Sequence, residues 1–153
     1  MNSQQTSIKY GIMAGTAIVL YLLLFYNLDR ASIFNPLVFW GSLIFPMVGM
    51  VVATRKLREH QSGEISKKEA IQTSFLSWVV AMTFLHIFIY LLFNFIDNGL
   101  IDLQKEMFEA STDIKVKRED LEMTFGSLFF RWALMMIPGF LLSYTVASFL
   151  KNK

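Results

Sequence analysis

The chain has 153 residues and a net charge of +2; 54% of its residues are hydrophobic and only 17% are charged. A soluble domain of this size could not bury so much apolar surface, so the composition predicts a protein embedded in lipid. The absence of cysteine excludes disulfides and thiolate metal sites. The small, scattered charge gives no support for nucleic acid as a partner.

Four apolar runs without acidic or basic side chains are each about 17 to 27 residues long, close to the roughly 20 that a membrane-crossing helix needs. They lack the alternation of barrel strands. We therefore predict an all-α polytopic membrane protein, a single four-helix bundle over residues 1–153. Its transmembrane helices are expected at about 8–28, 36–61, 66–97 and 127–150.

The three prolines of the sequence fall in the second and fourth predicted helices. Asn35 suits an N-cap and Pro36 the first helical position. Pro46 and Pro138 lie inside predicted helices, where each removes a backbone donor and should kink the helix. Neighbouring helices are expected to satisfy the freed carbonyls.

The charged stretch TRKLREHQSGEISKKEAIQTSF, residues 54–75, lies between two apolar runs. Ser66 and Glu69 match a capping box, in which each side chain satisfies the backbone N–H of the other residue. Gly63 suits the left-handed residue that ends the preceding helix. The stretch is therefore predicted to be a short polar hinge, with little room for a catalytic loop.

The longest polar segment, residues 98–126, contains seven acidic and four basic residues. Leu100, Leu103 and Met107 fall at helical spacing. We predict a short amphipathic helix lying against the membrane or the bundle, a break near residues 111–114, and a polar lead-in to the last helix. The segment could be a solvated connector or a cap that binds a partner.

The distribution of lysine and arginine predicts the orientation. One side of the predicted bundle has eight basic residues: Lys9, Arg55, Lys56, Arg58, Lys67, Lys68, Lys151 and Lys153. The other side has six among nine acids: Arg30, Lys105, Lys115, Lys117, Arg118 and Arg131. We expect both termini in the cytoplasm and residues 98–126 outside.

Several of these segments together resemble a known family. They are KYGIMAG at the first helix, NP at the second, SGEISKKEAIQTSF at the hinge, NFID at the end of the third, and the acidic amphipathic segment. Nearly the whole chain is similar to the bacterial membrane family catalogued as domain of unknown function 4199, common in Bacteroidota. The family has no established activity, so the resemblance assigns no functional residue. It implies one partner hypothesis, a membrane-associated glycosyltransferase resembling polyprenyl-phosphate mannose synthases.

Within the four apolar runs, residues 10–26, 36–53, 70–96 and 132–150, His86 is the one side chain of acidic or basic type, and it lies near mid-membrane. Proton-coupled transporters usually need intramembrane carboxylates, and none is present there, which argues against that class. His86 could form a proton or metal site, but the other histidine, His60, is predicted on the cytoplasmic side. The alternative is a neutral imidazole bonded to a Ser, a Thr or a backbone carbonyl of a neighbouring helix.

Small residues recur at four-residue spacing on three predicted helices, which lets helix backbones approach closely. The stripes support packing within the bundle or, alternatively, an interface with a second copy or a protein partner. Their members are Gly11 and Gly15; Thr73, Ser77 and Ala81; and Gly139, Ser143 and Ala147.

Asp97 and Arg131 are predicted at the outer edge of the third and fourth helices. Each lies at the unfavourable end of its helix dipole and therefore gains from a neighbour of opposite sign. We predict that the two side chains pair. In the alternative, Arg131 extends to lipid headgroups and Asp97 meets water.

No motif for nucleophilic, hydrolytic or phosphate chemistry is present in the sequence, and none of its patterns calls for a cofactor. We expect a non-enzymatic inner-membrane accessory or scaffold subunit that contacts membrane lipids and a protein partner or a second copy. The alternative is a small transporter or lipid-handling protein without proton coupling, with a cavity between the second and fourth helices. A continuous polar path would favour transport, and a dry interior of Phe, Leu and Met would favour the scaffold.

Overall fold

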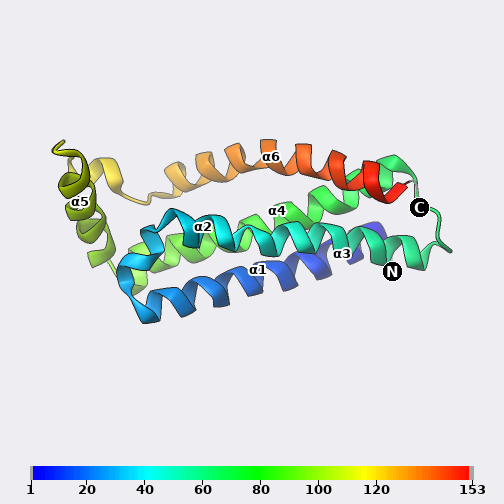
Figure 1. Cartoon of the computed structure of the whole chain (residues 1–153), viewed down its shortest axis with the longest axis horizontal. Coiled ribbons are helices and arrows are strands. Elements are labelled where there is room, and N and C mark those ends of the chain that lie inside the picture. Colours follow the sequence, from blue (N-terminus) through cyan, green and yellow to red (C-terminus); the bar gives the residue numbers. More distant parts are fainter. Residues whose placement is uncertain (1, 152–153) are drawn as a thin grey trace.

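The computed structural model describes residues 2–151, with side chains for residues 2–150, and every regular element in it is helical. Long helices lie side by side along one axis (Figure 1). Four segments are long and apolar enough to cross a membrane: Ser3–Leu28, Pro36–His60, Lys67–Ile96 and Arg118–Leu150. The predicted all-α fold with four candidate spans is confirmed. Lys153 and the Lys151 side chain, both counted in the charge bias, lie outside this description.

Helix α1, Ser3–Leu28, begins about five residues earlier than predicted because a capping box precedes it. The Asn2 side chain accepts the Gln5 backbone N–H at 2.8 Å, and the Gln5 side chain accepts the Asn2 N–H at 3.3 Å. These bonds satisfy donors that a helix N-terminus leaves free. The chain then turns through the 3₁₀ helix η1, Arg30–Phe34, whose N-cap is Asp29.

The second span is divided into α2, Pro36–Ser42, and α3, Ile44–His60. The predicted start is confirmed, because the Asn35 side chain accepts the Leu37 N–H at 2.9 Å and Pro36 follows it. The break falls at Leu43, three residues before Pro46. A proline within a helix removes one donor and clashes with the carbonyl four residues earlier, so the interruption at this position has a direct cause.

The hinge between α3 and α4, Lys67–Leu91, has the predicted geometry. The Ser66 side chain accepts the Glu69 N–H at 3.2 Å, and Glu69 accepts the Ser66 N–H at 3.2 Å. Gly63 has φ of +91°, in the left-handed region, and its N–H donates to the Arg58 carbonyl at 2.9 Å. The predicted capping box and helix-ending glycine are both confirmed.

Helix α4 is the centre of the bundle and packs against α1, α3 and α6, Phe125–Lys151. It ends in one π-helical turn, η2, Leu92–Ile96. Helix α6 packs mainly on α4 and touches α3 only slightly, and its span has the smallest buried share of the four. Figure 1 shows α6 running along one side of the bundle. The fourth span is therefore attached to the other three chiefly through α4.

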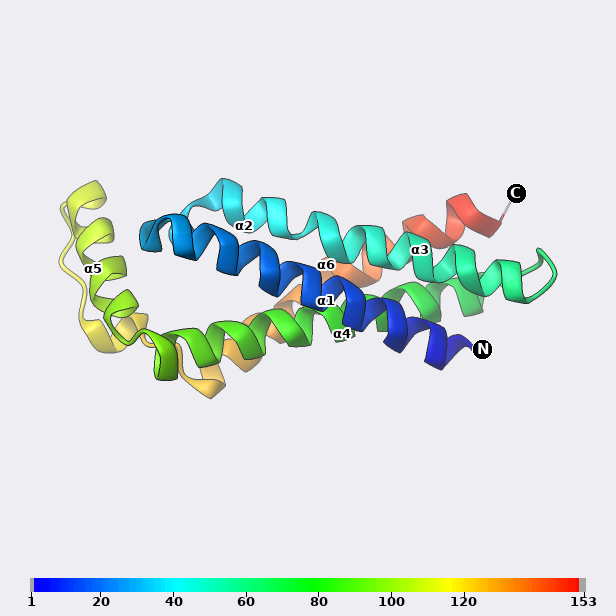
Figure 2. The same cartoon turned by 90° about the horizontal axis from the view of Figure 1, so that it is seen from below.

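Helix α5, Gly99–Thr112, lies across one end of the bundle, transverse to the long helices (Figures 1 and 2). It buries Leu100 and Ile101 against the bundle and ends at Asp113, which has φ of +55°. The short helix η3, Arg118–Leu121, follows. An ion pair of 3.0 Å between Arg118 and Asp102 holds the returning chain against α5.

The interior is filled by apolar side chains. Ile18, Met50 and Leu85 are completely buried, as is Leu92. Most buried hydroxyls donate to a carbonyl of their own helix, as Thr54 does to Met50 at 2.8 Å. Such bonds satisfy the hydroxyl without building a polar network between helices. The described interior is therefore mainly apolar.

Candidate functional site

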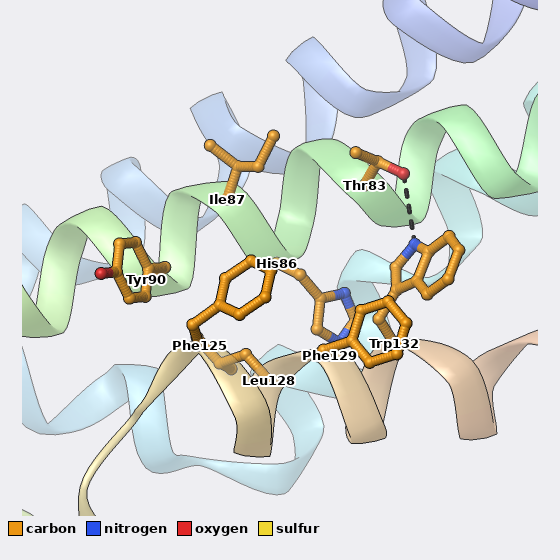
Figure 3. A pocket seen from close by; sticks show the side chains of 8 residues that line it. All are labelled: Thr83, His86, Ile87, Tyr90, Phe125, Leu128, Phe129 and Trp132. Carbon is orange, nitrogen blue, oxygen red and sulfur yellow. Dashed lines mark hydrogen bonds between the residues drawn. The ribbon is translucent and has the colours of Figure 1, made fainter.

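A groove of about 410 Å³ lies between α4 and α6. Figure 3 shows side chains of both helices pointing into it. Its lining is almost wholly apolar and consists of Thr83, His86, Ile87, Tyr90, Phe125, Leu128, Phe129 and Trp132. The sequence hypothesis places a cavity between the second and fourth spans. This groove lies instead between the third and the fourth, whereas a second hollow, near the hinge, does lie between α3 and α6.

Aromatic rings form one wall of the groove along α6. Phe125 and Phe129 stack with ring centroids 6.2 Å apart, and Phe129 and Trp132 stack at 5.7 Å. Spacings of three and four residues place these rings on one face of the helix. Phe129 keeps 56% of its surface exposed and Ile87 keeps 54%, so the groove opens toward the surroundings of the bundle.

Two polar side chains of α4 face α6 inside this apolar lining. The Trp132 Nε1–H donates to the Thr83 hydroxyl at 3.2 Å, and that hydroxyl donates to the Val79 carbonyl at 2.8 Å. His86 Nδ1 lies 2.8 Å from the Met82 carbonyl oxygen. A carbonyl only accepts, so Nδ1 must carry the proton, and in the neutral ring Nε2 keeps its lone pair.

His86 does bond a backbone carbonyl, as expected for a neutral imidazole with a structural role, but the carbonyl belongs to its own helix. The expectation of a neighbouring helix is wrong, because the carbonyl four residues earlier already lies within reach of Nδ1. Among the residues that the structure describes, no cluster of three or more metal-ligating side chains occurs. His86 is thus a groove residue with one ring nitrogen engaged.

The carboxylate of Asp97 is held by Arg30. Arg30 Nε and Nη2 donate to Asp97 Oδ2 and Oδ1, both at 2.7 Å, and the Tyr26 hydroxyl donates to Oδ2 at 2.8 Å. The guanidinium bonds hold the pKa of Asp97 below its ordinary value, and the tyrosine bond acts in the same direction. This cluster ties the end of α1 and the start of η1 to the end of η2.

The predicted pair of Asp97 with Arg131 is wrong. Both carboxylate oxygens of Asp97 are occupied by Arg30, and Arg131 Nη1 instead donates weakly to Met123 Sδ at 3.5 Å. The sequence does not single out Arg30, yet the signal was present. Arg30 directly follows the end of the first span, at the same edge of the bundle as Asp97.

The small residues pack helices within the bundle. A side chain at Gly11 would collide with Val80, and one at Gly15 with Phe84, so both glycines let α1 approach α4 closely. Gly139 lies directly against the ring of Trp78 on α4. Ser143 is fully buried and donates to the Gly139 carbonyl at 2.7 Å. These contacts support packing within the chain for the two stripes that contain glycine.

At the opposite end of the bundle, basic side chains surround a second hollow of about 600 Å³. Its lining includes Arg55, Arg58 and Glu59 from α3 and Phe149 from α6. Arg58 Nε donates to the Gly63 carbonyl at 2.7 Å and Nη1 to the Leu150 carbonyl at 3.2 Å. Arg58 therefore joins the hinge to the end of α6, which is a structural role.

The chain belongs to the family described as Protein of unknown function (DUF4199), whose model matches residues 9–152. The resemblance found in the sequence is thereby confirmed across nearly the whole chain. No curated protein and no solved structure matches it.

Proposed function

We propose that this chain is a non-enzymatic accessory or scaffold subunit of the bacterial inner membrane, with both termini in the cytoplasm. The observation that supports the proposal is the close-packed, apolar interior. Gly11 and Gly15 bring α1 against α4, and apolar side chains fill the space between the spans. A body of this kind offers a fixed surface to other membrane components.

The distribution of charge supports the same function. The ion pairs of the described residues lie at the two ends of the bundle or on α5, and none crosses its middle. The hydroxyls of Thr54 and Ser74 face the interior but donate to carbonyls of their own helices. A transported ion or polar solute would need a continuous row of free polar groups, and these hydroxyls do not provide one.

Helix α6 is the surface best suited to a partner. It is the least buried span and presents many exposed apolar side chains, among them Phe130, Ile137 and Leu141. Aromatic side chains are enriched where proteins meet, because they offer a large contact area at low entropic cost. The partner we propose is another integral membrane protein, and a membrane-associated glycosyltransferase is the first to test.

Site-specific photocrosslinking in native membranes tests this function. A benzophenone amino acid at Phe130 on α6 should give a discrete adduct with one membrane protein. Leu20 on α1 is the matched control, since the two side chains are almost equally exposed, at 64% and 62%. It should give lipid adducts alone. Lipid adducts alone at both positions, with no protein that co-purifies with the chain, would contradict the scaffold function.

The groove between α4 and α6 specifically favours the second candidate function, lipid handling without proton coupling. It is apolar, it opens sideways, and its volume of about 410 Å³ suits a small apolar molecule. Transfer of fluorescent lipid between vesicles, with and without the reconstituted chain, distinguishes the two functions. A scaffold leaves the transfer rate unchanged.

A further inference from the structure

The groove between α4 and α6 has the dimensions of a small-molecule site. Ligand pockets in proteins typically occupy roughly 300–1,000 Å³ and are lined mainly by apolar and aromatic side chains with a few polar groups. The groove has about 410 Å³ and such a lining. Because Ile87 and Phe129 at its rim are more than half exposed, a molecule dissolved in the bilayer can enter from the side.

Two polar atoms of the lining side chains have no partner among residues 2–150, His86 Nε2 and the Tyr90 hydroxyl, and Figure 3 shows that hydroxyl directed away from His86. His86 Nδ1 donates to the Met82 carbonyl, whereas no described group bonds His86 Nε2. A charged imidazolium would be costly in an apolar membrane groove, so Nε2 is a bare acceptor. The indole N–H of Trp132 is already engaged by Thr83. Beside His86, the groove therefore offers an acceptor and no free donor.

The acceptor at His86 Nε2 determines which polar group of a ligand fits there. The oxygens of a carboxylate or a phosphate are themselves acceptors and cannot bond to Nε2. An amide brings a carbonyl that would find no donor beside it. A hydroxyl is the smallest group that supplies a donor, and a phenolic hydroxyl donates more strongly than an aliphatic one. The stacked rings of Phe125, Phe129 and Trp132 form a surface on which an aromatic ring can pack.

We propose that the α4–α6 groove binds an apolar phenol, with the ring against the aromatic wall of α6 and the hydroxyl donating to His86 Nε2. Figure 3 shows the imidazole extending from α4 toward α6, between the rings of the wall. The proposal goes beyond the scaffold function and does not depend on it. A chain that crosslinks no protein partner can still bind the phenol, and a scaffold can leave the groove empty.

Nitrogen NMR of the full chain in lipid nanodiscs tests the hydrogen bond. His60→Gln leaves His86 as the only histidine, because the chain has two. The probes are 4-heptylphenol and its methyl ether, in which one added methyl group removes the hydroxyl donor. The phenol should shift the Nε2 resonance saturably, and the ether should leave it in place. An equal shift with both probes, or no shift with either, overturns the proposal.

Affinity measurements on variants add a second, independent test. His86→Phe keeps a ring but removes the acceptor, and it should weaken phenol binding about two- to tenfold, the effect of one hydrogen bond. Ile87→Trp should fill the groove and abolish binding. Leu20→Trp, at a similarly exposed position on α1, should change nothing. Unchanged binding in both groove variants overturns the proposal. If His86→Phe fails to fold, the result for Ile87→Trp alone decides the test.

Discussion

The indole ring of Trp78 lies against the backbone of α6 at Gly139, in the space that a side chain there would occupy. Its Nε1–H donates to the carbonyl of Met135 at 3.0 Å. That carbonyl neighbours the one that Pro138 leaves without an intrahelical donor. This contact holds α6 closely against α4.

Adding a single methyl group at Gly139 should therefore separate the two helices. We expect Gly139→Ala to lower the free energy of unfolding in detergent by about 1–3 kcal/mol, the usual range for overpacking. Gly126→Ala is the matched control, since nothing lies within 4 Å of a side chain at Gly126 near the start of the same helix. It should be neutral or stabilising by up to about 1 kcal/mol. Equal effects of the two substitutions would show that Trp78 does not restrict Gly139.

The Asp97–Arg30 pair can be separated from the rejected Asp97–Arg131 pair by two double-mutant cycles. Asp97→Asn and Arg30→Gln should have non-additive effects on the free energy of unfolding, because both break the same ion pair: the first removes the carboxylate charge and one acceptor, and the second removes the guanidinium. Asp97→Asn and Arg131→Gln should be additive within error. Coupling in the second cycle and additivity in the first would falsify the observed pairing.

Acid should weaken the cluster of Asp97, Arg30 and Tyr26. Arg30 holds the pKa of Asp97 below its ordinary value of about 3.9. Because the folded pKa is lower than the unfolded one, the contribution to stability is complete above the unfolded value and is lost as the pH falls through the folded value. The melting temperature of the native chain should therefore fall more steeply below pH 4 than that of Asp97→Asn. Parallel curves would show that the carboxylate adds no acid-sensitive stability.

The hinge capping box should contribute measurably to the stability of α4. Ser66→Ala removes the side chain that accepts the Glu69 N–H and should cost about 1 kcal/mol. Glu69→Ala should also destabilise, because it frees the Ser66 N–H. Lys68→Ala, between them and exposed, should have no effect. Equal melting temperatures for all three variants and the native chain would contradict the cap.

The helix caps and turns, which depend on residues close together in the sequence, could be predicted. The ion pair between residues far apart in the sequence could not. The cap at Ser66, the start at Asn35 and the turn at Gly63 depend on residues within a few positions, and all three are present. The charge partner of Asp97 was missed because several cations share one end of the bundle. The placement of Arg30 by η1 decides among them.

The groove was missed for a related reason. Its volume depends on how α6 lies against α4, which follows from the Trp78–Gly139 contact and from the slight contact between α6 and α3. The hydropathy of the sequence does not report the distance between two packed helices. His86 was recognised as unusual, because a titratable side chain inside an apolar run stands out at any packing.

The orientation in the membrane can be tested with single cysteines, because the chain has none of its own. Ser62, at the hinge, and Ser111, at the end of α5, are both exposed and lie at opposite ends of the bundle. The lysine and arginine bias places Ser62 in the cytoplasm. A thiol reagent that cannot cross the inner membrane, applied to intact cells, should label Ser111→Cys and spare Ser62→Cys. The reverse pattern would invert the proposed topology, and labelling of both only after lysis would place residue 111 in the cytoplasm as well.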